Sequence, residues 1–227
     1  MKMKYPNAFI GVKRLFTSRV LAMIGLFALL VSTSVALVSS VILQNAADRG
    51  AAAGEILAVL ALGFMMGSCV IMVVSYILGI TGLSRASIDE PAFRIALFAT
   101  AANIIFIGFG SIFSSLQNDF MASLLNSFST IADLFTFIYT IQGIRSLALK
   151  LGDKDIDRRG NNLFKILLVA IIVEFIANLI VVIFQGAKTA LVIAGVIAIV
   201  SVLLTIIQYF MFLVYLVKAK KMLANAE

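Results

Sequence analysis

Two acidic residues, Asp133 and Glu174, stand deep inside long apolar stretches of the sequence. No Lys or Arg accompanies either carboxyl group at its depth in the stretch. An ionised carboxylate in an apolar medium costs several kcal/mol, so each acid is expected to be protonated or paired with a cation. If the two acids lie near each other, they predict a site that takes up protons or cations.

Four amide side chains extend this polar set: Asn103, Asn126, Asn178 and Gln208. Asn103 and Gln208 fall at about the same depth in their stretches as the two acids, and Asn126 shares a helix face with Asp133. Such polar faces turn toward protein or water in membrane proteins. The predicted ligand- or ion-binding residues are therefore Asp133, Glu174, Asn178, Asn103, Gln208 and Asn126. The alternative is that neutral acids bond to Thr, Asn or Gln of neighbouring helices and only fix the packing.

The elements that would hold these residues are transmembrane helices. The chain is 62% hydrophobic and only 13% charged, with a mean hydropathy of +1.11. A soluble domain is nearer about 45–50% apolar with about a quarter of its residues charged, so lipid must surround most of this chain. Hydrocarbon demands internally bonded backbone, which predicts an all-α, polytopic integral membrane protein. Six spans in a single domain of residues 1–227 are predicted at 20–43, 56–82, 92–114, 120–143, 163–185 and 189–217.

Basic residues alternate between the two sides of these spans. Only Arg49 and Lys188 fall on one side, and the other 16 of the 18 Lys and Arg residues fall on the opposite side. The positive-inside rule makes the rich side cytoplasmic and predicts a multi-pass protein of the cell membrane with both termini in the cytoplasm. Attraction to anionic lipids accounts for the net charge of +7, so no nucleic-acid partner is expected.

Two residue types limit the possible chemistry. The chain has no His, which excludes Ser–His or Cys–His nucleophile pairs and His-ligated metals within it. Cys69 is the only cysteine, so the chain can form neither an internal disulfide nor a thiolate metal cage. We expect Cys69 to be a small buried packing residue. The sequence predicts no metal, no cofactor and no enzymatic activity.

Helix boundaries are predicted from capping residues. Ser87 to Glu90 reads as a capping box, and Pro91 suits the first turn of the helix that follows. Asn161 and Asn162 are expected to cap the span at 163–185. Between spans, four apolar residues at helical spacing predict a short helix lying in the membrane interface: Ile144, Leu147, Ala148 and Leu151.

Small residues form two stripes that favour close helix packing. One lies on the first span, at Ala28, Ser32, Ala36 and Ser40, and the other is the pair Gly63 and Gly67 on the second. Small side chains let helix backbones approach closely in lipid. Packing within the bundle is one interpretation, and contact with another membrane subunit or a second copy is the other.

The leading functional hypothesis is a small transporter or permease-like subunit with a proton- or cation-coupled site at the bilayer midplane. In size and number of spans the chain is similar to the substrate-binding subunits of energy-coupling-factor vitamin importers, a likeness of architecture. The alternative is a non-transporting scaffold, assembly factor or regulatory subunit. A third hypothesis is a lipid-modifying enzyme, which would need the segment 153–159 to face a head group.

Overall fold

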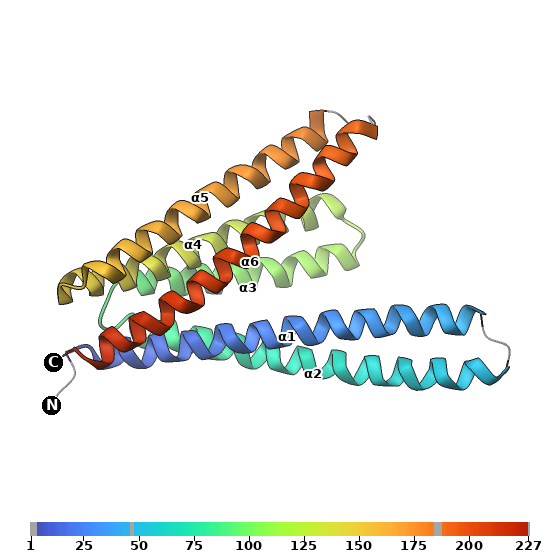
Figure 1. Ribbon diagram of the computed structural model, residues 1–227, viewed down its shortest axis with the longest axis horizontal. Helices are drawn as coiled ribbons and strands as arrows, with labels where there is room; N and C mark the ends of the chain where they lie inside the picture. Colours follow the sequence, from blue (N-terminus) through green and yellow to red (C-terminus); the bar gives the residue numbers. More distant parts are fainter. Residues whose placement is uncertain (1–3, 46–47, 184–187, 227) are drawn as a thin grey trace. The chain divides into compact units, whose positions relative to one another are not determined.

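The computed structural model describes residues 4–45, 48–183 and 188–226, and this part of the chain forms six α-helices and no strand. The helices are α1 (Pro6–Asn45), α2 (Asp48–Ala86), α3 (Ala92–Ser115), α4 (Asp119–Leu151), α5 (Lys154–Ile183) and α6 (Lys188–Ala224) (Figure 1). The description covers the backbone alone at residues 45, 48–52, 174–175, 177–183, 188–199 and 201–202. The predicted all-α fold is confirmed.

Within the described residues, five helices are long and apolar enough to cross a bilayer: α1, α2, α3, α4 and the Leu203–Ala224 part of α6. Residues 163–183 of the predicted span at 163–185 lie on α5, and most side chains from residue 174 onward fall outside the described residues. Large apolar side chains face outward on these helices, among them Phe120, of which 76% is exposed. Surfaces of this kind belong in lipid, so the chain is an integral membrane protein.

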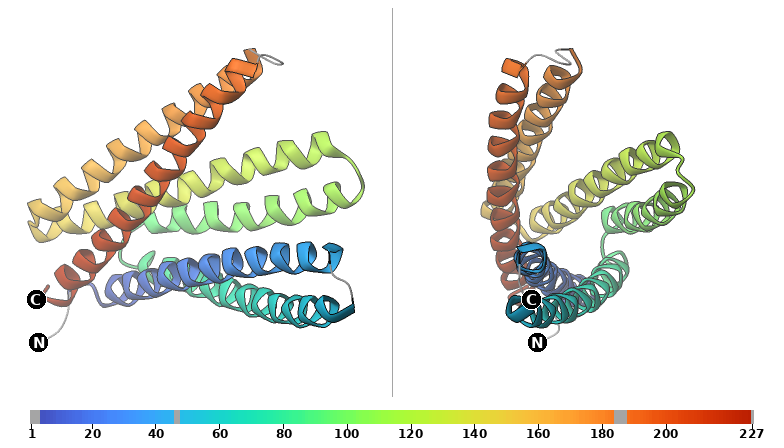
Figure 2. Two further views of the ribbon diagram at one scale, coloured as in Figure 1. Left: turned by 45° about the vertical axis from the view of Figure 1, so that its right-hand side comes forward. Right: turned by 90° about the vertical axis from the view of Figure 1, so that its right-hand side faces the viewer.

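The chain divides into two compact units. We call Lys13–Gly82 the hairpin unit, because it holds most of α1 and α2 lying side by side and antiparallel (Figure 2). The main unit consists of Met1–Val12 and Leu83–Glu227. In the main unit α3 packs along α4, α5 packs along α6, and α4 contacts both α5 and α6.

A seam of small residues joins the two helices of the hairpin unit. It repeats every seventh residue, with Ser18, Gly25, Ser32 and Ser39 on α1 and Gly54, Ala61, Ser68 and Ser75 on α2, all buried. The Ser39 hydroxyl donates to the Gly54 carbonyl (2.7 Å), and the Ser32 hydroxyl donates to the Ala61 carbonyl (2.6 Å). Each step of seven residues along α1 is thus matched by seven residues back along α2.

Ser18 and Ser75 continue this seam with two reciprocal bonds. The Ser18 hydroxyl donates to the Ser75 carbonyl (2.8 Å), and the Ser75 hydroxyl donates to the Ser18 carbonyl (2.7 Å). Between these layers, a Cβ placed on Gly25 would lie 3.6 Å from the Ser68 carbonyl oxygen. Backbones this close leave room only for small side chains, and the hydroxyl bonds fix the register in a medium that offers no water.

The predicted stripes of small residues do not form this seam. Of the first stripe only Ser32 is buried, while Ala36 and Ser40 are exposed and Ala28 is half-buried. Gly63 and Gly67 are exposed as well, with nothing within 4 Å of a Cβ built on either. A seven-residue repeat replaces the four-residue ladder because two long helices stay in contact only if they supercoil at about 3.5 residues per turn.

The outer surface of the hairpin unit is apolar. Phe27 is 69% exposed and Val59 is 72% exposed. Cys69 is exposed too, so the prediction that it is a buried packing residue is wrong. The seam occupies only one residue in seven on each helix, and most other positions are left facing outward.

The polar end of the main unit, where α3 and α5 begin and α4 and α6 end, carries caps that come from distant parts of the chain. The Asp89 carboxylate accepts a hydrogen bond from the Ala8 backbone N–H (2.7 Å) and another from the Asn7 side-chain amide (3.1 Å). A carboxylate at this position satisfies an otherwise unpaired N–H of α1 and opposes the positive end of the helix dipole.

Glu90 likewise bonds to a different helix. Its carboxylate accepts hydrogen bonds from the Ser146 hydroxyl (2.9 Å) and the Lys150 ammonium (2.6 Å), both on α4. Helix α3 begins at Ala92 after Pro91, and no side chain caps it. The predicted capping box is therefore wrong, because its acids are drawn into contacts between helices.

Helix α4 continues to Leu151 and ends at Gly152, whose φ of +75° is a left-handed conformation that glycine adopts without strain. Along this last part, Ile144, Leu147 and Ala148 are fully buried in the main unit. The predicted separate interface helix is therefore wrong: these apolar residues pack against protein.

Asp153 starts the next helix. Its carboxylate accepts bonds from the backbone N–H groups of Asp155 and Ile156 (3.1 Å each), so α5 begins at Lys154. Asn161 and Asn162 consequently lie inside α5, and the prediction that they cap it is wrong. The span prediction started the helix where the sequence becomes apolar, whereas the helix itself begins nine residues earlier.

Candidate functional site

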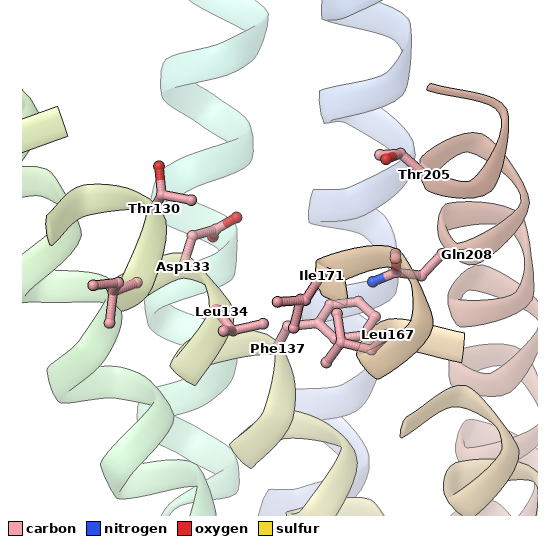
Figure 3. Close-up of a pocket in the computed structure, with 10 residues that line it drawn as sticks. Thr130, Asp133, Leu134, Phe137, Leu167, Ile171, Thr205 and Gln208 are labelled. Carbon is pink, nitrogen blue, oxygen red and sulfur yellow. The ribbon is translucent and has the colours of Figure 1, made fainter. Parts of the chain in front are cut away.

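A cavity of about 380 Å³ opens between α4, α5 and α6 in the main unit (Figure 3). Ten residues line it: Thr130, Ile131, Asp133, Leu134, Phe137, Leu167, Ala170, Ile171, Thr205 and Gln208. Four of these side chains are polar and six are apolar. The cavity thus combines a small polar group with a mainly apolar wall, as small-molecule sites do.

Asp133 is the one ionisable residue among the ten that line the cavity. It lies on α4 ten residues before Gly143, which at about 1.5 Å per residue is roughly 15 Å along the helix. The side chain is exposed. Among the described residues, no Lys or Arg forms an ion pair with it. Asp133 therefore presents to the cavity a carboxyl group that no described Lys or Arg neutralises.

Three polar side chains accompany Asp133 at the cavity. Thr130 lies one helical turn earlier on α4, and Thr205 and Gln208 lie one turn apart on α6. Gln208 is half-buried. In Figure 3 the Asp133 carboxyl and the Gln208 amide both extend into the space between α4 and α6. The hydroxyl and amide oxygens add neutral acceptors to the negative charge of an ionised Asp133.

The apolar part of the wall comes from α4 and α5. Leu134 and Phe137 lie on α4, and Leu167 and Ile171 on α5. The Phe137 ring packs against Phe212 of α6, with 4.4 Å between ring centroids and a 44° tilt. This contact fixes the ring from the side of α6.

Asn103 lies in a different polar contact, between α3 and α4. Its side-chain oxygen accepts a hydrogen bond from the Ser129 hydroxyl (2.5 Å), and Asn103 is 4% exposed. One turn away the buried hydroxyls of Thr100 and Thr136 are 3.2 Å apart. These groups satisfy one another, so the contact acts as hydrogen-bonded packing between two helices.

Asn126 is also on the α3 side of α4. A Cβ built on Gly110 of α3 would lie 3.1 Å from the Asn126 side-chain oxygen, so the two helices approach closely there. Of the six predicted site residues, the structure brings Asp133 and Gln208 to one cavity and places Asn103 and Asn126 at the α3–α4 contact. The side chains of Glu174 and Asn178 lie outside the described residues.

Thr130 and Thr205 are cavity residues that the predicted site did not include. Their spacing from Asp133 and Gln208, three residues in each case, was the available signal, because residues three apart share a helix face. Phe137, one turn beyond Asp133, had no such signal. In an apolar helix an aromatic residue facing a cavity looks the same as one facing lipid.

At the polar end, ion pairs tie the helices together. Arg145 of α4 pairs with Asp157 of α5 (2.8 Å), and Asp155 pairs with Arg159 (2.8 Å) and more loosely with Lys218 of α6 (3.6 Å). The hydrogen bond from Arg159 holds the pKa of the Asp155 carboxyl below its usual value. No cluster of three or more metal-binding side chains occurs in the part of the chain that the structure describes.

The long apolar helices define the chain as a polytopic helical membrane protein, and its main unit holds a mainly apolar cavity with one carboxyl group, that of Asp133, among the described lining residues. No protein-family model matches the chain, and no curated protein or solved structure is significantly similar to it.

Proposed function

We propose that the chain is a small transporter or permease-like subunit whose proton- or cation-coupled site is the cavity at Asp133. One observation carries the proposal: the Asp133 carboxyl is exposed to a cavity between three helices, without an ion-pair partner among the described residues. A purely structural acid in a membrane helix would be expected to bond to a neighbouring helix, as Asn103 does. The proposal assigns the chain no enzymatic reaction.

The proposal places the chain in the cell membrane with both termini in the cytoplasm. The ends of α4 and α6 and the start of α5 carry Lys150, Lys154, Arg158, Arg159 and Lys218. Basic residues are retained on the cytoplasmic side of a membrane, so this end would face the cytoplasm. The site would then lie about halfway across, where protons or cations would be exchanged between the two sides.

Carbodiimide labelling tests the site directly. Dicyclohexylcarbodiimide adds to a protonated carboxyl in an apolar setting and leaves an acyl urea on the side chain, which peptide mass spectrometry locates. In native membranes we expect Asp133 to be labelled at mildly acidic pH and progressively less as the pH rises. Asp119, exposed at the first turn of α4, serves as the matched acid and should stay unlabelled. Labelling of Asp133 no stronger than that of Asp119 at every pH would overturn the proposal.

Flux provides the functional arm of the test. Proteoliposomes carrying a trapped pH dye are given an inside-negative potential with valinomycin and a potassium gradient. We expect proton uptake with the wild-type chain and with Asp119→Asn, and loss of that uptake with Asp133→Asn. Equal uptake by wild type and Asp133→Asn would exclude Asp133 from the transport step.

A non-transporting scaffold is the second candidate, and the hairpin unit favours it. Its seam uses one residue in seven, while apolar residues such as Leu37 and Met66 remain more than 60% exposed. A scaffold would show no proton uptake in the flux experiment, either as wild type or as a variant. Its Asp133→Asn variant would differ from wild type in thermal stability alone.

A further inference from the structure

We propose that the cavity at Asp133 binds amphipathic organic cations of single positive charge, that is, amines or quaternary ammonium ions with an apolar body. This inference rests on the proposed function and names the class of ligand for the same site. It follows from the charge, the size and the wall of the cavity.

The charge of the cavity selects a monovalent cation. Asp133 is the one ionisable residue among the ten described lining residues, so this described part of the wall supplies a single negative charge. Thr130, Thr205 and Gln208 add neutral groups only. Divalent ions such as Ca²⁺ bind to sites with several carboxylate oxygens, and one carboxylate with neutral neighbours is a poor match for them. The Asp133 carboxylate would neutralise completely a ligand that carries a single positive charge.

The size of the cavity favours an organic ligand over a bare ion. Its volume of about 380 Å³ compares with about 30 Å³ for one water molecule in the liquid. A dehydrated monovalent metal ion would occupy a small fraction of this space. The remainder would have to hold water against apolar walls, which water avoids. The volume lies instead within the range of about 300–1,000 Å³ that is typical of small-molecule sites.

The wall separates polar from apolar groups. In Figure 3, Thr130, Asp133 and Thr205 lie above Leu134, Phe137 and Leu167. A ligand with a cationic head at Asp133 would place its apolar body against the lower side chains. The Phe137 ring, which packs against Phe212, adds an aromatic face for that apolar body. Such a ligand would enter from the bilayer, in which amphipathic cations accumulate.

A matched pair of ligands tests the inference on the unmodified protein. Benzyltrimethylammonium carries a permanent positive charge, and neopentylbenzene has the same shape with a neutral carbon in place of the nitrogen. Each is added to native membranes before dicyclohexylcarbodiimide at a fixed, mildly acidic pH. We expect the ammonium ion to protect Asp133 from labelling in a saturable manner, while neopentylbenzene and sodium chloride leave the labelling unchanged.

The other outcomes each overturn the inference in a recognisable way. Protection by sodium alone would identify an inorganic cation site, and protection by neither compound would identify a proton site. In both cases the proposed function would stand and this inference would fail. Equal protection by both compounds would mean that shape alone governs binding and that the charge of Asp133 plays no part. An Asp133 that is never labelled would remove the proposed function itself.

An aromatic substitution adds a second, independent measurement. Phe137→Leu should raise the half-protecting concentration of benzyltrimethylammonium by about 2- to 13-fold, the range expected for loss of one contact between aromatic rings. Phe128→Leu is the matched control, because Phe128 is also on α4 and pairs with Phe106 (5.6 Å) away from the cavity. Both variants should retain pH-dependent labelling of Asp133. An unchanged half-protecting concentration in a folded Phe137→Leu protein would remove Phe137 from the site.

Discussion

At the scale of single residues, the acids of this chain fall into two kinds. Glu90 is 6% exposed and bonded to Ser146 and Lys150, whereas Asp133 is exposed at a cavity without a described cationic partner. The first arrangement holds helices together, because a buried carboxylate is stable only with its partners in place. The second leaves the carboxyl available for a ligand. Substitution of Glu90 should therefore lower the stability of the protein, whereas substitution of Asp133 should change its ligand chemistry.

Glu90→Gln should destabilise the protein by about 1–3 kcal/mol, because the buried side chain loses its charge-assisted bonds to α4. The Lys150 side chain is 45% exposed and can bond to water instead, so the loss of stability comes mainly from the buried side chain at position 90. Unfolding by denaturing detergent would measure the difference. Glu55→Gln, at an exposed acid of α2, is the control and should remain within about 0.5 kcal/mol of wild type. An equal, small effect at both positions would contradict a bonding role for Glu90.

Asn103 and Asp133 should separate stability from ligand chemistry. Asn103→Leu removes the acceptor of the Ser129 hydroxyl and should cost about 0.6–2 kcal/mol of stability while leaving the pH dependence of Asp133 labelling unchanged. Asp133→Asn should remove the labelling with little loss of stability. If Asn103→Leu shifts the pH dependence, the α3–α4 contact and the cavity are one coupled site.

At the scale of elements, the seam between α1 and α2 depends on small residues at fixed positions. Ser32→Leu inserts a large side chain where α1 meets the Ala61 carbonyl and removes one hydrogen bond. We expect a loss of about 1–3 kcal/mol from overpacking. Ser40→Leu makes the same chemical change at an exposed position and should be within about 0.5 kcal/mol of wild type. Thermal unfolding in one detergent compares them, and equal losses would show that the register is not the one described.

The sequence predicts the helices of this chain better than their ends or their contact faces. Apolar runs specify helices because lipid leaves the backbone no other way to bond. The start of α5 was misplaced because a polar stretch, residues 154–162, is helical before the apolar run begins. The cap of α3 was misassigned because Asp89 and Glu90, which look like local caps, bond to α1 and α4 instead. The sequence does not reveal which face of a helix makes contacts, because nearly every face of these helices is apolar. Asp133 and Gln208 were predicted to lie together only because they fall at about the same depth in their helices. Depth does not say which way a side chain turns, and Asn103 of α3 and Asn126 of α4 both lie at the α3–α4 contact.

At the scale of the whole molecule, the distribution of Lys and Arg predicts which ends face the cytoplasm. Gln117→Cys lies in the α3–α4 connection and Asn225→Cys follows α6 at the polar end, each made in a Cys69→Ser background. A maleimide that cannot cross membranes should label Gln117→Cys in intact cells and Asn225→Cys only after the membrane is opened. The reverse pattern would invert the proposed orientation and, with it, the direction of any transport.

The bonds at the polar end also impose an order on assembly during synthesis. The seam of the hairpin unit can close once residue 75 has entered the membrane, since both of its helices are then present. The first turn of α1 has to wait for Asp89, and the backbone N–H of Lys4 pairs with the carbonyl of Ala226 (3.3 Å), which is made more than two hundred residues later. A ribosome stalled midway through synthesis would therefore hold α1 and α2 already packed along their seam, while the start of α1 has not yet bonded to the rest of the main unit.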